Sequence, residues 1–200
     1  MRGRRALPAV LLVAALAMGR PMTNPAQSQA TGPALIDAVA RGDIASLERL
    51  IADGAPLQAT DAAGQTPLLL AVQGNNLDAA TRLIAAGADI NAQATNRDTP
   101  WLLAGALGRT AMLRLMLPKG PDLSIRNRFG GNALIPACER AHIEAIKVLL
   151  TTPIDVNHIN NLGWTGLLEA VILSDGGPRH LEIVRLLLEH GADPNIVDKD

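Results

Sequence analysis

Cys138 and His142 are the two residues of this 200-residue chain whose types and spacing most resemble a catalytic pair. On one helix, a separation of four residues would bring the thiol close to the imidazole, as a nucleophile and its base require. The carboxylates are scattered singly, and the sequence has no Ser-His-Asp order, phosphate-binding glycine loop or Cys/His cluster with metal-ligand spacing. We therefore expect no metal site and no cofactor.

A second pair, Arg179 and His180, lies in the segment SDGGPRHL at 174–181. Arginine and histidine side chains together can recognise an anion, and Gly176-Gly177-Pro178 would shape a turn that presents them. Asp175, Arg179 and His180 are therefore a candidate ligand-binding loop. The alternative is a longer surface loop that tolerates insertion at modest entropic cost. The sequence leaves both interpretations open.

Both pairs belong to a chain that repeats every 33 residues. Steps of this length connect Thr165 with Asn132, Thr99 and Thr66. An alanine follows each of these positions by five residues, where a small side chain lets two helices approach closely: Ala71, Ala104, Ala137 and Ala170. Each unit has two short apolar runs at helical spacing. This period indicates stacked supersecondary units instead of one globular core.

The repeated motifs are GQTPL at 64–68, AAGADIN at 85–91 and HGADPN at 190–195. In these motifs the chain resembles the ankyrin repeats, in particular exported bacterial ankyrin-repeat domain proteins. The resemblance implies an all-α solenoid of stacked helix-turn-helix repeats with short β-turn fingers. It places the repeats at about 33–64, 65–97, 98–130, 131–163 and 164–200.

The repeat register separates the candidate catalytic pair. Cys138 follows the packing alanine Ala137 in a first helix, whereas His142 stands at the entry to the second helix, across a turn. We therefore expect a buried thiol, a turn-capping histidine and no enzymatic activity. Trp101 replaces the leucine of the T-P-L motif, so we expect it in the core. The segment 174–181 then contains a five-residue insertion between the two helices of the fifth repeat.

The resemblance also implies a function, because ankyrin repeats bind other proteins through their fingers and the concave face of their first helices. Carried over position by position, the partner-binding residues are Gln65, Thr95, Asn96, Asp98, Arg128, Phe129, Glu139, Arg140, Asn161 and Trp164. Phe129 and Trp164 stand out, because aromatic side chains dominate binding hot spots. The alternative is that each ring only packs against the adjacent finger. Anion sensing at 174–181 is the second functional hypothesis.

The first 30 residues have the pattern of an export signal, with three arginines before about a dozen apolar residues. That run is shorter than the ~20 residues of a membrane-spanning helix, so we expect no stable membrane insertion after the signal is removed. We expect cleavage after Ala30, with Ala17 as the weaker option, and a periplasmic or secreted protein in residues 31–200. Twin-arginine export and the general secretory route both stay open.

Without residues 1–30 the chain has 14 basic and 19 acidic residues, so its net charge changes from −1 to −5. An acidic chain without a basic tract has no electrostatic footprint for nucleic acid. After Gly191 only half a finger remains, so we expect the array to lack a C-terminal capping repeat. Val184, Leu187 and Leu188 would then form an uncovered apolar face.

Overall fold

The computed structural model describes residues 25–173 and 176–198, which form pairs of short helices. No β-strand occurs within these two ranges, and the predicted all-α fold is confirmed. The helices are α1 (Pro25–Arg41), α2 (Ile44–Ala52), α3 (Pro67–Gln73), α4 (Leu77–Ala85), α5 (Pro100–Ala106), α6 (Thr110–Met116), the 3-10 helix η1 (Leu117–Lys119), α7 (Leu134–Glu139), α8 (Ile143–Leu149), α9 (Gly166–Ile172) and α10 (Pro178–Glu189).

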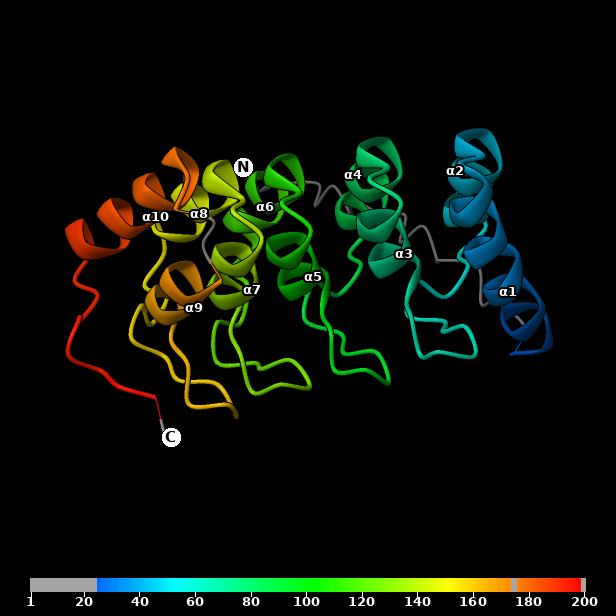
Figure 1. Ribbon diagram of the computed structural model, residues 1–200. Coiled ribbons are helices and arrows are strands. Elements are labelled where there is room, and N and C mark those ends of the chain that lie inside the picture. The colour runs from blue at the N-terminus through cyan, green and yellow to red at the C-terminus, as the bar shows by residue number, and fades with distance from the viewer. Residues whose placement is uncertain (1–24, 174–175, 199–200) are drawn as a thin grey trace, which may run out of the picture.

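The helices stack in two layers, with turns projecting from one side (Figure 1). The first layer runs α1, α3, α5, α7 and α9, and the second runs α2, α4, α6, α8 and α10, each helix contacting its neighbour in the row. The two helices of each pair also contact each other. Each helix is therefore covered by the other helix of its pair and by the helices of the neighbouring units. None of the helices in the described ranges combines the length and apolar character needed to cross a membrane.

The recurring threonine begins first-layer helices by capping them. The Thr66, Thr99 and Thr165 hydroxyls accept hydrogen bonds from the backbone N–H three residues later, at 3.3, 3.1 and 3.2 Å. Each bond satisfies one of the amide groups that a helix start leaves without a partner. Asn132 replaces threonine in the fourth unit, and its side-chain oxygen accepts from Leu134 and Ile135 N–H. The cap is therefore retained despite the substitution.

The small residues lie at the contacts between units, as predicted. Ala71, Ala104, Ala137 and Ala170 are at most 1% exposed, and Trp101 is 2% exposed, which confirms its core position. At α9 the contact is closer still, because a Cβ added to Gly166 would lie 3.2 Å from the Cys138 sulfur. The proline found at this place in α3 and α5 would therefore press on the thiol, which gives a steric reason for glycine in the fifth unit.

The fifth unit differs from the sequence prediction at α10. This helix begins at Pro178, directly after Gly177 in an extended conformation, so Arg179 and His180 belong to its first turn and not to a loop. Proline favours such a first helical position because its fixed φ fits a helix and it has no N–H to leave unpaired. Asp175 lies outside the described residues.

The apolar face expected at this end of the array is only partly correct. Leu187 is fully buried, Val184 is half-buried, and Leu188 is 44% exposed. Leu187 lies one helical turn after Ile183, so both side chains are on the same face of α10, and this face packs into the core. Besides Leu188, the exposed apolar side chains at this end include Val171 and Leu181.

Candidate functional site

A cavity of about 340 Å³ lies between the last two complete fingers and helices α7 and α9. We call it the finger pocket. It is lined by Asn127, Arg128, Phe129, Gly131, Ile135, Pro136, Glu139, Arg140, Asn160, Leu162, Trp164, Glu169 and Leu173. Five of the ten predicted partner-binding residues therefore meet here: Arg128, Phe129, Glu139, Arg140 and Trp164.

The two fingers of the pocket are built on asparagine turns. Asn127 Oδ1 accepts hydrogen bonds from the N–H groups of Phe129 and Gly131, both at 2.9 Å. Asn160 Oδ1 does the same for Leu162 and Trp164, at 2.9 and 3.0 Å. Such bonds fix a turn by substituting for backbone pairing. The fingers carrying Phe129 and Trp164 are therefore ordered by their own side chains.

Neighbouring fingers are also joined by backbone hydrogen bonds. Asn161 N–H donates to the Phe129 carbonyl at 2.9 Å, and Thr95 N–H donates to the Ala63 carbonyl at 3.1 Å. His158 Nε2 lies 2.6 Å from the Gly130 carbonyl oxygen. Asn161 does not line the finger pocket. It contributes to the site by joining the two fingers that do.

Large apolar surfaces remain accessible at the mouth of the pocket. Phe129 is 53% exposed and Leu162 is 62% exposed, while Trp164 is half-buried. The Arg128 guanidinium carbon lies 4.6 Å from the centre of the Phe129 ring, within the range of a cation–π contact. An aromatic ring, an indole and a leucine around one cavity offer the apolar surface that binding hot spots use.

Glu169 lies in the wall of the pocket with 6% of its surface exposed. Burial raises the pKa of Glu169 to about 7, and the negative charge of Glu139 adds to the shift, whereas a hydrogen bond from Asn160 opposes it. That bond runs from Asn160 Nδ2 to Glu169 Oε1 over 3.3 Å. The pocket therefore contains a carboxyl group that changes charge near neutral pH.

Three more predicted residues lie in the preceding finger. Asn96 Nδ2 donates to the Asp98 carboxylate at 2.8 Å, and Asn96 Oδ1 accepts from Asp98 N–H at 3.0 Å. Burial raises the pKa of Asp98, while the charges of Arg128 and Arg140 and the Asn96 bond lower it. Asp98 thus lies near Arg128 of the next finger and Arg140 of α7. Thr95 is exposed on the same finger.

Gln65 lies two units away from the finger pocket. Its side-chain amide donates to Gln73 Oε1 at 3.0 Å, and it lines a separate cavity of about 480 Å³ near α1 and α3. The structure therefore does not bring Gln65 together with Phe129 and Trp164.

Cys138 and His142 do not form a catalytic pair. Cys138 is fully buried, and burial followed by the charge of Glu169 raises the pKa of its thiol. His142 stands directly before α8 and makes no side-chain cap hydrogen bond to that helix, whereas its ring has a hydrogen bond with the Ala106 backbone. A Cβ atom on Gly108 of the preceding unit would lie 2.6 Å from the His142 ring, so the ring packs against this glycine. Burial and nearby arginines lower the His142 pKa, so the ring is mainly neutral at pH 7.

Three arginines reach back to the first helix of the preceding unit. Arg109 donates to the Gln73 carbonyl at 3.4 Å, Arg140 to the Ala106 carbonyl at 2.8 Å, and Arg179 to the Ala141 carbonyl at 2.9 Å. These bonds satisfy carbonyl groups at or just after helix C-termini, where cations are favourable. Arg140 and Arg179 therefore have a structural role besides any contact with a ligand.

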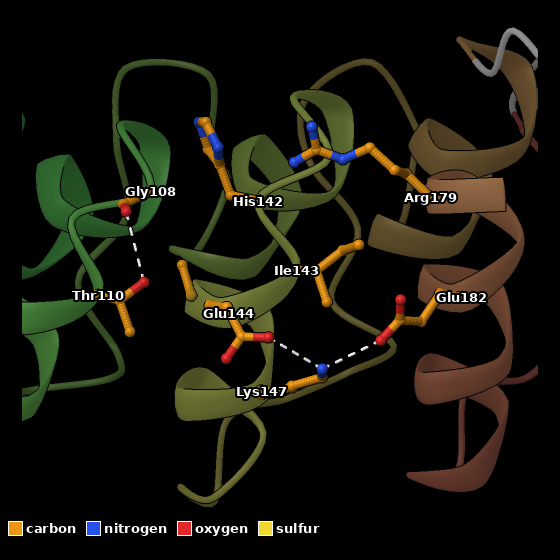
Figure 2. A pocket seen from close by; sticks show the side chains of 9 residues that line it. Gly108, Thr110, His142, Ile143, Glu144, Lys147, Arg179 and Glu182 are labelled. Atoms are coloured by element: carbon orange, nitrogen blue, oxygen red, sulfur yellow. Dashed lines mark hydrogen bonds and ion pairs between the residues drawn. The ribbon is translucent and has the colours of Figure 1, made fainter. Parts of the chain in front are cut away.

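A third cavity, of about 450 Å³, lies between the beginnings of helices α6, α8 and α10. Figure 2 shows the Arg179 guanidinium extending toward the side on which His142 lies. Lys147 lies lower in the cavity, 2.9 Å from Glu144 and 3.0 Å from Glu182 (Figure 2). The positive charge of Lys147 is thus compensated by two carboxylates. Within the described ranges, no group of three or more His, Cys, Asp or Glu residues could hold a metal ion.

Glu169 and Asn160 are not among the residues predicted from the sequence. The signal for Glu169 was a departure from the apolar residues at the equivalent positions of the second to fourth units, Leu70, Leu103 and Pro136. Asn160 occupies the position of Asn127, so only its additional bond to Glu169 distinguishes it. That bond depends on how finger and helix meet in space.

Comparison with known proteins agrees with this geometry. A family model described as ankyrin repeats (3 copies) matches residues 12–94, 35–127 and 101–198. The ankyrin repeat protein YahD of Escherichia coli (strain K12) is 54% identical over 89 residues, which are 44% of this chain and 44% of that protein. Ankyrin repeat and SOCS box protein 6 of Homo sapiens is 35% identical over 92 residues, 44% of this chain and 22% of that protein. The chain thus matches less than half the length of these relatives.

Solved structures cover more of the chain. A crystal structure of an ankyrin repeat protein superimposes with a TM-score of 0.82 and 43% identity, covering 84% of this chain and 86% of the other. An ankyrin repeat domain from Acinetobacter baumannii AYE has a TM-score of 0.81 and 47% identity, covering 84% and 85%.

Proposed function

Because the chain belongs to the ankyrin-repeat family, we propose that it is a scaffold that binds another protein at the finger pocket. Ankyrin repeats generally mediate protein–protein interaction, and the family is generally not enzymatic. The observation that carries this site assignment is the gathering of Phe129, Leu162 and Trp164 around one cavity. Exposed aromatic and apolar surface of this kind is what a partner protein covers.

The charged residues around this surface would give the interaction its selectivity. Arg128, Glu139 and Arg140 are exposed at the pocket, and Asp98 lies half-buried in the preceding finger. Polar groups at the rim of an apolar contact select among partners more than they add affinity. The proposed interface therefore has an apolar centre at Phe129 and Trp164 and a charged rim.

We place this function in the bacterial cell envelope, on the basis of the export signal in residues 1–30. Cleavage after Ala30 would cut within α1, ahead of Leu35 and Ala38, which are buried in the array. Pro33 lies inside α1 and has no N–H for a helical bond to Gln29, which supports a first unit that begins near Pro33. Intact mass of the protein from fractionated cells tests this: the expected N-terminus is Thr31, and retained Met1 would refute export with cleavage.

Affinity capture from an envelope extract tests the function. The 200-residue chain and its Phe129→Ala/Trp164→Ala variant would be immobilised in parallel, and the retained proteins identified by mass spectrometry. A protein held by the parent and lost by the variant is the expected result. Ile159→Ala is the matched control, since Ile159 is an exposed finger residue outside the pocket. If the double variant retains the same proteins as the parent, the pocket is not the binding site.

Binding of a small anion is the second candidate function, supported by Arg179 and His142 at one cavity (Figure 2). Lys147 is compensated by Glu144 and Glu182, so an anion would depend on Arg179. Thermal melting with phosphate or sulfate tests it against chloride at equal ionic strength. An increase in melting temperature that Arg179→Ala abolishes would support the site, and no increase would refute it.

A further inference from the structure

Glu169 stands where the second, third and fourth units have an apolar residue, whereas the first unit has the exposed Asp37. Leu70, Leu103 and Pro136 occupy the equivalent positions, and all three are half-buried. A carboxyl group at such a place loses favourable hydration when it is buried, which is a cost that an apolar residue does not have. Leucine fills this position in two other units, and of the two acidic side chains found here Asp37 is exposed and only Glu169 is buried, so stability does not explain Glu169.

We propose that the finger pocket receives a lysine or arginine side chain of the partner protein, and that Glu169 and Glu139 recognise its charge. This inference rests on the proposed function, because it specifies what the same pocket binds. It concerns one side chain at the centre of the interface, and the surrounding contacts would come from the rest of the partner segment.

The charges around Glu169 favour a cation. Within the described ranges, no ion pair joins Glu139 or Glu169 to a lysine, arginine or histidine. The arginines that line the pocket have other contacts: Arg128 stacks on Phe129, and Arg140 donates to the Ala106 carbonyl. Neither contact neutralises a guanidinium, so the pocket lining carries both signs. The group whose charge acts on Glu169 is Glu139, and an incoming positive charge between these two carboxyl groups would relieve their mutual repulsion.

The other groups near Glu169 add no positive charge. The Cys138 thiol lies behind it and stays protonated, because burial raises its pKa. Asn160 donates one hydrogen bond to Oε1 and so holds the carboxylate in the wall of the pocket. Glu139 comes from α7 and adds negative charge. Arg128 and Arg140 also act on Asp98 of the preceding finger.

The walls suit the stem of a long basic side chain. Trp164, Leu162 and Ile135 line the pocket beside Glu169. Lysine and arginine place their methylene stems on apolar surface while the charged end seeks polar partners, and an indole also attracts a cation. At Glu169 a purely apolar side chain would leave the carboxyl group desolvated, and an acidic one would be repelled by Glu139 and Glu169, even though Arg128 and Arg140 also line the pocket.

Peptide display on the 200-residue chain tests the proposal. A random seven-residue library would be selected in parallel on the parent, on Glu169→Gln and on Trp164→Ala. The parent is expected to enrich peptides with a lysine or arginine at one fixed position among apolar residues. Trp164→Ala should not retain them, and Glu169→Gln should bind them at least about tenfold more weakly at pH 8. Circular dichroism verifies that Glu169→Gln is folded, and Glu144→Gln, outside the pocket, is the control for loss of one carboxylate.

The pH dependence gives an independent readout with a histidine-free peptide that lacks acidic residues. Because an ionised Glu169 is required, the parent should bind about tenfold or more weakly at pH 5.5 than at pH 8, and Glu169→Gln should not change comparably. Enriched peptides that need Trp164 but contain no basic residue, or bind Glu169→Gln equally well, overturn this inference and leave the proposed function intact. Absence of any Trp164-dependent peptide overturns both.

Discussion

Asn160 Nδ2 donates a hydrogen bond to Glu169 Oε1 across 3.3 Å, and this contact joins a finger turn to the helix behind it. The same Asn160 side chain also holds its own turn through Leu162 and Trp164 N–H. The orientation of the Trp164 finger and the position of the Glu169 carboxyl group are thus linked through one side chain. This link makes Glu169 the residue from which the chemistry of the finger pocket can be tested.

The contribution of Glu169 to stability should decrease as pH rises, and Glu169→Gln should remove this contribution. Burial raises the pKa of Glu169 from 4.5 to about 7, so between these values the folded state binds more protons than the unfolded state. Its contribution to stability is therefore fully present below about pH 4.5 and lost as pH rises through 7. The loss is at most about 3 kcal/mol, and less where water enters the pocket.

Melting temperatures of the parent and Glu169→Gln at pH 5 and pH 8 measure this effect. The variant should gain on the parent at pH 8, and Glu139→Gln should show a smaller gain because Glu139 is the second cause of the shift. A residue that lowers stability at neutral pH yet is needed for binding is typical of functional sites. Parallel pH profiles for parent and variant would show that Glu169 titrates normally.

Enlarging Ala137 should destabilise the array. Ala137 is 0% exposed and lies in α7, which contacts both α5 and α9. Leucine there would overpack the contact, and we expect a loss of about 1–3 kcal/mol in the free energy of unfolding. Urea unfolding followed by circular dichroism measures it, with Ala111→Leu at an exposed helical position as the matched control. Equal midpoints for the two variants would contradict the packing assigned to Ala137.

The Cys138 thiol should react only after unfolding. It is 0% exposed, and its raised pKa leaves little thiolate at neutral pH. A chromogenic disulfide reagent should therefore label the native protein slowly and label one thiol rapidly in denaturant. Fast labelling without denaturant would mean that the contact between α7 and α9 opens readily, or that the thiol is activated.

The sequence predicted the parts of the structure that depend on spacing alone. The 33-residue period placed the alanines between helices, Trp101 in the core and Cys138 apart from His142. It did not predict the ionisation of Glu169, because that depends on burial and on Glu139 from another helix. It also assigned Arg179 to a loop, since the period ends at the insertion and Pro178 begins α10 without a repeat to compare. Three-dimensional proximity between helices explains the first difference, and the local preference of proline for a first helical position explains the second.

The final prediction concerns the apolar stripe of α10 formed by Leu181, Val184 and Leu188. These residues are spaced for one helix face, and Leu181 and Leu188 are 61% and 44% exposed. Val171 of α9, 56% exposed, lies beside Leu181 and Val184 at a cavity of about 190 Å³. Contiguous apolar surface of this kind promotes association. We therefore expect the 200-residue chain to self-associate as its concentration rises, and Leu181→Lys/Leu188→Glu to reduce this association.

Sedimentation velocity over a concentration series measures the effect, with Leu77→Lys, an exposed leucine of α4, as the control. A parent that stays monomeric throughout the series, or a control that acts as strongly as the double variant, would show that this stripe does not drive association.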